Sequence, residues 1–221
     1  MLKFILIIMV LFFSVMVHEY AHGLVALFFG DDTAKRAGRL SLNLVRHIDL
    51  VGTIIVPLVL LSFYLMSGSG IIFGWAKPVP VSAQNLRNPA RDYTLVSVAG
   101  PLSNILLAFA FGFVWAPLTM ISLQTSAFLS VARFICFLGV KINIILALFN
   151  LIPIPPLDGS NVVSYLLPYP LSLRYRKIAR YGILVILILI LTDTLRYPFL
   201  LADYLSRAIL DWMYRVGSFL G

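Results

Sequence analysis

Two histidines and a glutamate lie inside the first long apolar run of the chain, in the order His18-Glu19-Tyr20-Ala21-His22. On a helix, residues four apart share one face, so His18 and His22 are placed to bind a single zinc ion. The spacing also puts Glu19 beside them, where its carboxylate is expected to take the proton from a zinc-bound water. Such groups cost on the order of several kcal/mol each in hydrocarbon unless they have partners. Their position therefore predicts a hydrolytic metal site within a membrane helix.

A catalytic zinc ion usually keeps three protein ligands and one open position, so a third ligand is expected. Asp158 is the best candidate, because it follows a proline-broken end of an apolar segment, where irregular backbone can line a cavity. An aspartate before Gly159 also suits a plain turn, and spacing alone leaves both interpretations open. His47 is the rival ligand, but its place beside Arg46 and near Asp49 favours a surface or ion-paired histidine.

Two asparagines in apolar segments are further candidates. Asn150 precedes Asp158 in the same motif, and its amide is suited to binding a substrate backbone or the oxyanion of an attacked carbonyl. Capping of its own helix is an equally weighted alternative for Asn150. Asn104 is placed to bond across helices or to brace the site, whereas Gly100 and Ser103 are expected to allow close helix packing.

The composition predicts an integral membrane protein with a single domain, residues 1–221. Of the 221 residues, 61% are hydrophobic and 12% are charged, with a mean hydropathy of +0.98, whereas soluble domains have about 25% charged residues. The net charge of +8 indicates basic loops against anionic lipid headgroups. The basic residues are dispersed, which argues against a nucleic-acid partner. The single cysteine, Cys136, excludes an intramolecular disulfide and a thiolate zinc cluster.

The hydropathy pattern predicts an all-α polytopic fold with about five apolar segments, at residues 2–29, 51–73, 93–117, 129–152 and 179–200. A span needs roughly 20 residues. The first segment is longer than a signal-peptide core of about 7–15 residues, so we expect it to be a retained helix. The second is interrupted by Pro57 and a Gly-Ser-Gly run, which makes it a candidate for a re-entrant segment.

The connections carry weaker patterns. Alternating residues at 39–44 predict a short strand or hairpin after the first helix, and residues 74–81 predict an extended interfacial chain with two prolines. Residues 160–177 are expected to form a basic loop, and 201–221 an interfacial amphipathic helix.

The depth of Asp158 poses a geometric difficulty. If the first four segments all cross fully, the fourth leaves the membrane on the side away from His22. Asp158 then reaches the histidines only if the proline-rich chain folds back, or if segment 51–73 is re-entrant. Since hydrolysis needs an extended substrate, the strand at 39–44 is expected to pair with it.

Three motifs together resemble the site-2 protease family of intramembrane zinc metalloproteases, and they span about 140 of the 221 residues: His18 to His22, Ala99-Gly100-Pro101-Leu102-Ser103-Asn104, and Asn150 to Gly159. The resemblance implies that His18, His22 and Asp158 bind zinc, that Glu19 activates water, and that Asn150 holds substrate or stabilises the oxyanion. Residues 74–81 look like the compact prokaryotic members without a PDZ or nucleotide-sensing domain, which implies a multi-pass protein of the prokaryotic plasma membrane.

We therefore predict an intramembrane zinc-dependent endopeptidase with one zinc ion. It is expected to hydrolyse a peptide bond in or near a transmembrane segment of a membrane or membrane-associated protein substrate. A zinc transporter or metal-sensing membrane protein using the same ligands is the alternative. A catalytically silent scaffold is disfavoured, because it has no need of Glu19.

Overall fold

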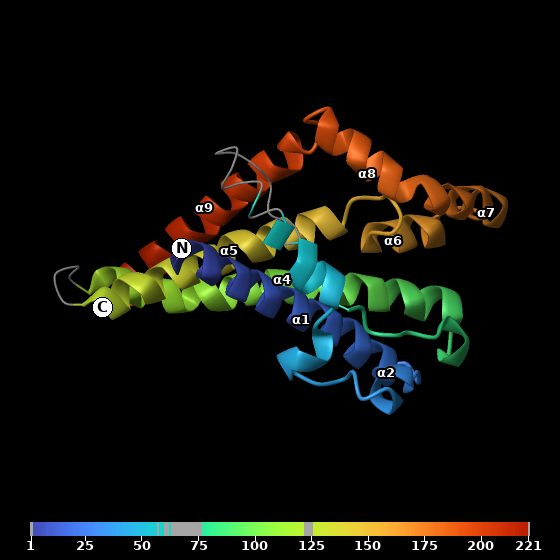
Figure 1. Ribbon diagram of the computed structural model, residues 1–221, viewed down its shortest axis with the longest axis horizontal. Helices are drawn as coiled ribbons and strands as arrows, with labels where there is room; N and C mark the ends of the chain where they lie inside the picture. The colour runs from blue at the N-terminus through green and yellow to red at the C-terminus, as the bar shows by residue number, and fades with distance from the viewer. Residues whose placement is uncertain (1, 57, 60–61, 63–76, 122–125, 221) are drawn as a thin grey trace.

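The described part of the protein is built from helices. The computed structural model describes residues 2–56, 58–59, 62, 77–121 and 126–220 (Figure 1), and these residues include no strand. Three of the helices are long and apolar enough to cross a membrane, and a bent pair of helical segments allows a fourth span. These features confirm the all-α polytopic class. The predicted segment 51–73, with its possible re-entry, lies mostly outside the described residues.

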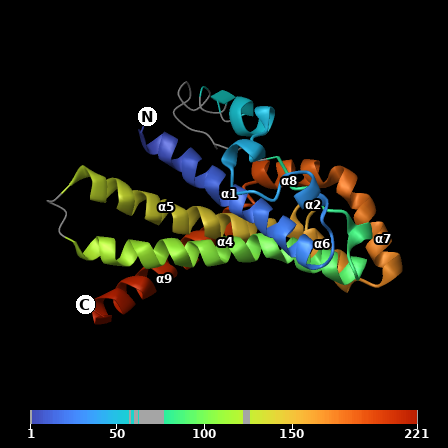
Figure 2. The same ribbon diagram turned by 90° about the horizontal axis from the view of Figure 1, so that it is seen from below.

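A central bundle consists of α1 (Leu2–Phe28), α4 (Pro89–Met120) and α5 (Ala127–Asn150). Hydrogen bonds of His18 with Asn104 and of His22 with Val96 show that α1 and α4 run antiparallel. Leu6 and Val10 of α1 pack with Leu138 of α5, and the later residue Ser14 accepts a hydrogen bond from the later residue Asn143. Residue numbers therefore increase in the same direction along both helices, which run parallel. Figures 1 and 2 show the three helices lying side by side.

This arrangement removes the difficulty about depth. The last turn of α1 and the approach to α4 are joined by a hydrogen bond from the Arg87 amide to the Phe29 carbonyl, 3.1 Å long. The chain between them therefore begins and ends at one end of the bundle. Because α5 runs parallel to α1, it ends at that same end, and the supposition of four full crossings does not hold for these helices.

The predicted strand at 39–44 is wrong. After α2 (Thr33–Arg36) the chain forms bends, followed by the short helices η1 (Leu44–His47) and η2 (Leu50–Ile55). The Asn43 side chain accepts a hydrogen bond from the Val45 amide, and the Asn43 amide donates to the Ser41 hydroxyl. Local bonds of this kind compete with strand pairing, and an alternating hydrophobic pattern does not reveal them.

The predicted basic loop at 160–177 is also wrong, because this region is mostly helical. It contains α6 (Asp158–Leu166) and α7 (Tyr169–Lys177), separated by a short break that ends with Pro168. The small residues Gly159, Ser160 and Ser164 are the buried ones of α6, which packs against α4. Basic residues occur both in loops and on the exposed faces of short surface helices, so composition alone does not distinguish the two.

The C-terminal part is a bent helical arm. It comprises η4 (Ile178–Tyr181), α8 (Gly182–Leu191) and α9 (Arg196–Leu220). The helical stretch Tyr169–Leu191 and the helix Arg196–Ser218 are bent by 75° relative to each other. The predicted apolar segment 179–200 is therefore divided between them. The amphipathic stretch predicted at 201–221 lies in α9, which packs against α4 and α5 (Figure 1). Lys141 on α5 donates to Asp203 on α9 over 2.8 Å.

Candidate active site

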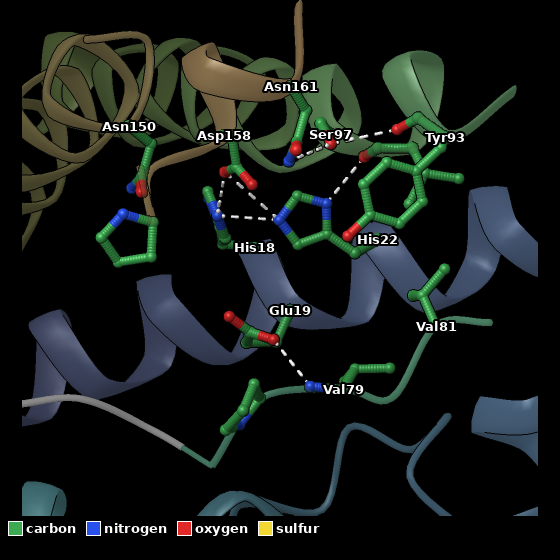
Figure 3. Close-up of a pocket in the computed structure, with 13 residues that line it drawn as sticks. His18, Glu19, His22, Val79, Val81, Tyr93, Ser97, Asn150, Asp158 and Asn161 are labelled. Atoms are coloured by element: carbon green, nitrogen blue, oxygen red, sulfur yellow. Dashed lines mark hydrogen bonds and ion pairs between the residues drawn. The ribbon is translucent and has the colours of Figure 1, made fainter. Parts of the chain in front are cut away.

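Two histidines of α1 and the first residue of α6 meet at one point (Figure 3). The Asp158 Oδ2 atom lies 3.1 Å from His18 Nε2 and 3.4 Å from His22 Nε2, and the two Nε2 atoms are 3.0 Å apart. These are the three candidate ligands that the sequence favoured. The rival ligand His47 lies elsewhere, with its Nε2 atom 2.8 Å from the Ser41 carbonyl.

The donor set has the chemistry that zinc requires, namely two imidazole nitrogens and a carboxylate oxygen. His22 Nδ1 lies 2.7 Å from the Val96 carbonyl, which accepts and cannot donate, so the hydrogen of a neutral His22 is on Nδ1. The lone pair on Nε2 is therefore turned toward Asp158 and His18. The residues present thus fit a zinc ion, and a backbone carbonyl sets the protonation of one ligand.

A buried amide network sets the protonation of His18 in the same way. The Asn143 amide nitrogen donates to Ser14 Oγ at 2.9 Å and to the Gly139 carbonyl at 2.8 Å, so its oxygen accepts from Asn104 at 2.8 Å. The Asn104 oxygen is thereby turned to His18 Nδ1, 2.6 Å away, and accepts its hydrogen. Four side chains that are 0–5% exposed thus leave His18 Nε2 free to bind metal.

Gly100 makes room for both imidazoles. A Cβ atom built at this position would lie 2.5 Å from His18 Nε2 and 2.5 Å from His22 Nε2. The backbone of α4 at Gly100 therefore lies close to the edges of both imidazole rings of α1, in agreement with the close helix packing expected there. Ser103 donates to the Gly100 carbonyl at 2.7 Å within the same helix, a local bond that does not test the helix packing predicted for it.

Gly159 explains how Asp158 reaches the histidines. The chain turns back after α5, and a Cβ atom at Gly159 would lie 2.2 Å from the Leu151 carbonyl oxygen. Only glycine allows the start of α6 to lie against the end of α5 at this distance. The aspartate that suited a plain turn therefore stands at a close backbone contact, with its side chain directed at the metal donors.

Glu19 lies on a different side of α1 from the donor cluster. Its Oε2 atom accepts a hydrogen bond from the Val79 amide at 2.8 Å, and Figure 3 shows the carboxylate turned toward Val79 rather than toward Asp158. Residues 77–82 have no regular structure, in keeping with the extended chain predicted at 74–81, of which residues 74–76 lie outside the described part of the protein. Glu19 and Val79 line one pocket together with the donors, so the carboxylate reaches the same space.

The extended segment 77–82 is held in place by Asp31, just after α1. Asp31 is fully buried and accepts hydrogen bonds from the Ser82 amide at 2.6 Å, from Asn85 at 3.0 Å and from Thr33. Asn85 belongs to the short helix η3 (Ala83–Asn85). Desolvation opposes ionisation of Asp31, but the hydrogen bonds from Thr33, Asn85 and Ser82 outweigh it and lower the pKa of this carboxyl.

The pocket has a volume of about 390 Å³ and includes polar residues that the sequence did not single out. Asn150 lines it and donates to the Leu146 carbonyl at 3.0 Å, so one amide hydrogen bonds its own helix, as in the capping interpretation. The second hydrogen has no partner among the described residues.

Asn161 of α6 donates to Ser97 of α4 at 3.0 Å, beside Tyr93. Polar residues at helical spacing in apolar segments were the available signal for Asn143, whereas Asn161 gave none.

Comparisons with known proteins place this chain in a family. The model of peptidase family M50 matches residues 114–190. "Putative zinc metalloprotease YwhC" of Bacillus subtilis is 37% identical over 187 residues, which are 84% of this chain and 80% of the relative. "Putative zinc metalloprotease Rip2" of Mycolicibacterium smegmatis is 26% identical over 87% of this chain and 69% of the relative. No solved structure gave a significant match. The resemblance to the site-2 protease family is confirmed: the chain belongs to peptidase family M50 and is a metalloprotease.

Proposed function

We propose that this protein is an intramembrane zinc-dependent endopeptidase that hydrolyses a peptide bond in or near a transmembrane segment of its substrate. The observation that carries the proposal is the convergence of His18, His22 and Asp158 in a pocket on α1, which is itself apolar enough to span a membrane. Such a pocket gives a substrate helix access to polar chemistry from within the bilayer. A single zinc ion and a prokaryotic plasma-membrane location belong to the same proposal.

Each residue has a role in this chemistry. His18, His22 and Asp158 hold the zinc ion, which when bound polarises the carbonyl to be attacked and lowers the pKa of water. Glu19 accepts a proton from the attacking water and later returns it to the leaving amine. Val79 donates to the Oε2 atom of this carboxylate, and the Oε1 atom has no donor among the described residues. The free hydrogen of the Asn150 amide is directed to the developing oxyanion.

The substrate must be extended at the cleaved bond, because a helix hides its own carbonyls. The nearest extended main chain among the described residues is 77–82, which lines the pocket through Val79 and Val81. We assign the alignment of substrate to this segment, in place of the strand expected at 39–44. Backbone pairing of this kind selects an extended peptide without selecting its sequence.

The test is cleavage of a model transmembrane peptide by purified protein in liposomes. Glu19→Gln is expected to lower kcat by about 100-fold to 10,000-fold while leaving zinc affinity within about threefold of wild type. The matched control is Asp211→Asn, an acid-to-amide change at an exposed position of α9. Undiminished cleavage by Glu19→Gln overturns the role of Glu19, and zinc flux without peptide cleavage favours the transporter alternative.

A further inference from the structure

A second cavity adjoins the candidate active site. It has a volume of about 740 Å³ and lies between the first turns of α4, the helix α6 and the helix α7. Val81, Tyr93 and Asn161 line both this cavity and the pocket with the metal donors. The two spaces are therefore neighbours that share three lining side chains, and the second cavity lies next to the place where a bound substrate is cut.

The second cavity contains one charged group, Arg176, and no acidic side chain among the described residues that line it. Arg176 is exposed, but its Nε atom donates to Ser164 Oγ at 2.7 Å, and Ser164 shares a 2.9 Å hydrogen bond with Ser172. Both serines are buried. The guanidinium is thus held from one side by a fixed pair of hydroxyls, while its remaining N–H groups have no acidic partner in the described part of the chain.

We propose that this cavity binds the substrate polypeptide on one side of the cleaved bond and that Arg176 selects an acidic side chain there. The inference rests on the proposed protease function. The position beside the active site favours a polypeptide, because a substrate chain extends on both sides of the bond being hydrolysed and so reaches the neighbouring cavity. Charge favours an aspartate or glutamate, since a guanidinium with free N–H groups binds a carboxylate in a two-point geometry.

The position of the cavity also favours binding of an acidic side chain of the substrate. Pro89 and Ala90, the first residues of α4, contribute to its wall, and Arg176 in the last turn of α7 lines it. This end of the bundle therefore lies at the polar boundary of the apolar spans. An acidic side chain next to a transmembrane segment stays near water at this level, where it avoids the cost of burial in hydrocarbon.

The experiment uses full-length protein in liposomes and a model transmembrane peptide whose cut is first mapped by mass spectrometry. Single glutamates and single lysines are then scanned through the residues on both sides of the cut. We expect one position at which glutamate raises kcat/KM over lysine by about threefold to tenfold. The ratio is expected to fall to about one in Arg176→Gln and to invert in Arg176→Glu. In Arg176→Lys it should stay above one but be smaller than in wild type, because lysine keeps the charge and loses the two-point geometry.

Arg174→Gln is the matched control, because Arg174 lies on the same exposed helix but does not line the cavity. Zinc affinity and cut position of each variant check that the site is intact. No positional preference, or one that survives in Arg176→Gln, overturns the inference. An effect of Arg176 that appears only in anionic liposomes assigns it to a lipid headgroup and also overturns it. If wild type cleaves no peptide at all, the proposed function fails instead.

Discussion

The two sides of α1 around residues 18–22 are supported in different ways. On the donor side, His18 and His22 are held by fully buried Asn104 and by the Val96 carbonyl of a helix in the bundle. On the Glu19 side, the carboxylate accepts one hydrogen bond among the described residues, from a main-chain amide of segment 77–82. The metal ligands are therefore fixed by several helices, whereas the candidate base is held by a bond that any extended backbone can replace.

The two sides of α1 are therefore expected to control different properties of the protein. The donor side requires a fixed geometry, because a metal ligand displaced by a fraction of an ångström loses affinity. The Glu19 side faces the space that an extended substrate must enter, and its hydrogen bond is of the type that substrate main chain also offers. Changes on the donor side should therefore alter zinc affinity, and changes on the other side should alter stability or turnover without altering zinc affinity.

The largest expected effect follows from closing the space at Gly100. In Gly100→Ala the new Cβ atom would lie 2.5 Å from both imidazole Nε2 atoms, and neither ring is free to move because its Nδ1 atom is bonded. Zinc affinity is expected to fall by about 100-fold or more, measured by competition with a chromophoric chelator. The control Gly112→Ala on the same helix meets the flexible Met213 side chain at 3.3 Å. Equal zinc affinity in both variants would break the comparison.

An intermediate effect is expected from Asn143→Leu. This change removes the acceptor that orients Asn104 and leaves the Ser14 hydroxyl without the donor it has in Asn143, so the hydrogen on His18 is no longer confined to Nδ1. Zinc affinity is expected to fall by about 10-fold to 100-fold, and histidine ¹⁵N spectra of the metal-free protein should show a mixed tautomer. Ser14→Ala removes one acceptor only and should cost less. A single tautomer with unchanged affinity would contradict the role given to Asn143.

The smallest expected effect is Asp31→Asn, on the Glu19 side. Asp31 has a lowered pKa, so its stabilising contribution is present above the ordinary value of 3.8 and is lost as pH falls through the folded-state pKa. At neutral pH the variant should unfold more easily by about 1–3 kcal/mol, and the difference should shrink in acid. Thermal unfolding against pH measures this, with Asp211→Asn as control. Zinc affinity should not change, and a large loss of affinity would show that the two sides are coupled.

The helix that carries His18, Glu19 and His22 was predictable, since four-residue spacing inside a long apolar run has one simple interpretation. The proximity of Asp158 was predictable only as a candidate, because it depends on α1 and α5 running in parallel. Hydropathy does not determine at which end of the bundle α4 begins, and the bond from Arg87 to Phe29 shows that it begins where α1 ends. The difficulty about depth arises only if all four segments cross fully, and the parallel direction of α1 and α5 does not meet that condition.

Other features depend on contacts between distant residues or on local hydrogen bonds. The alternation at 39–44 resembled a strand, but the side chains of Ser41 and Asn43 bond to neighbouring amides. Asn143 was visible as a costly amide in an apolar segment, yet only the structure shows that it orients Asn104. Arg176 was part of a basic cluster in the sequence, and its separate role depends on the fold of α6 and α7.

The bond between Glu19 and Val79 has a spectroscopic consequence. Glu19 is the only glutamate among the 221 residues, so isotope-labelled glutamate introduces one labelled carboxylate into the protein. The infrared stretching frequency of a carboxylate depends on the hydrogen bonds that it accepts and on its protonation. Isotope-edited spectra of the intact protein in liposomes would therefore follow this one group without mutation, and would report when the Val79 amide releases it.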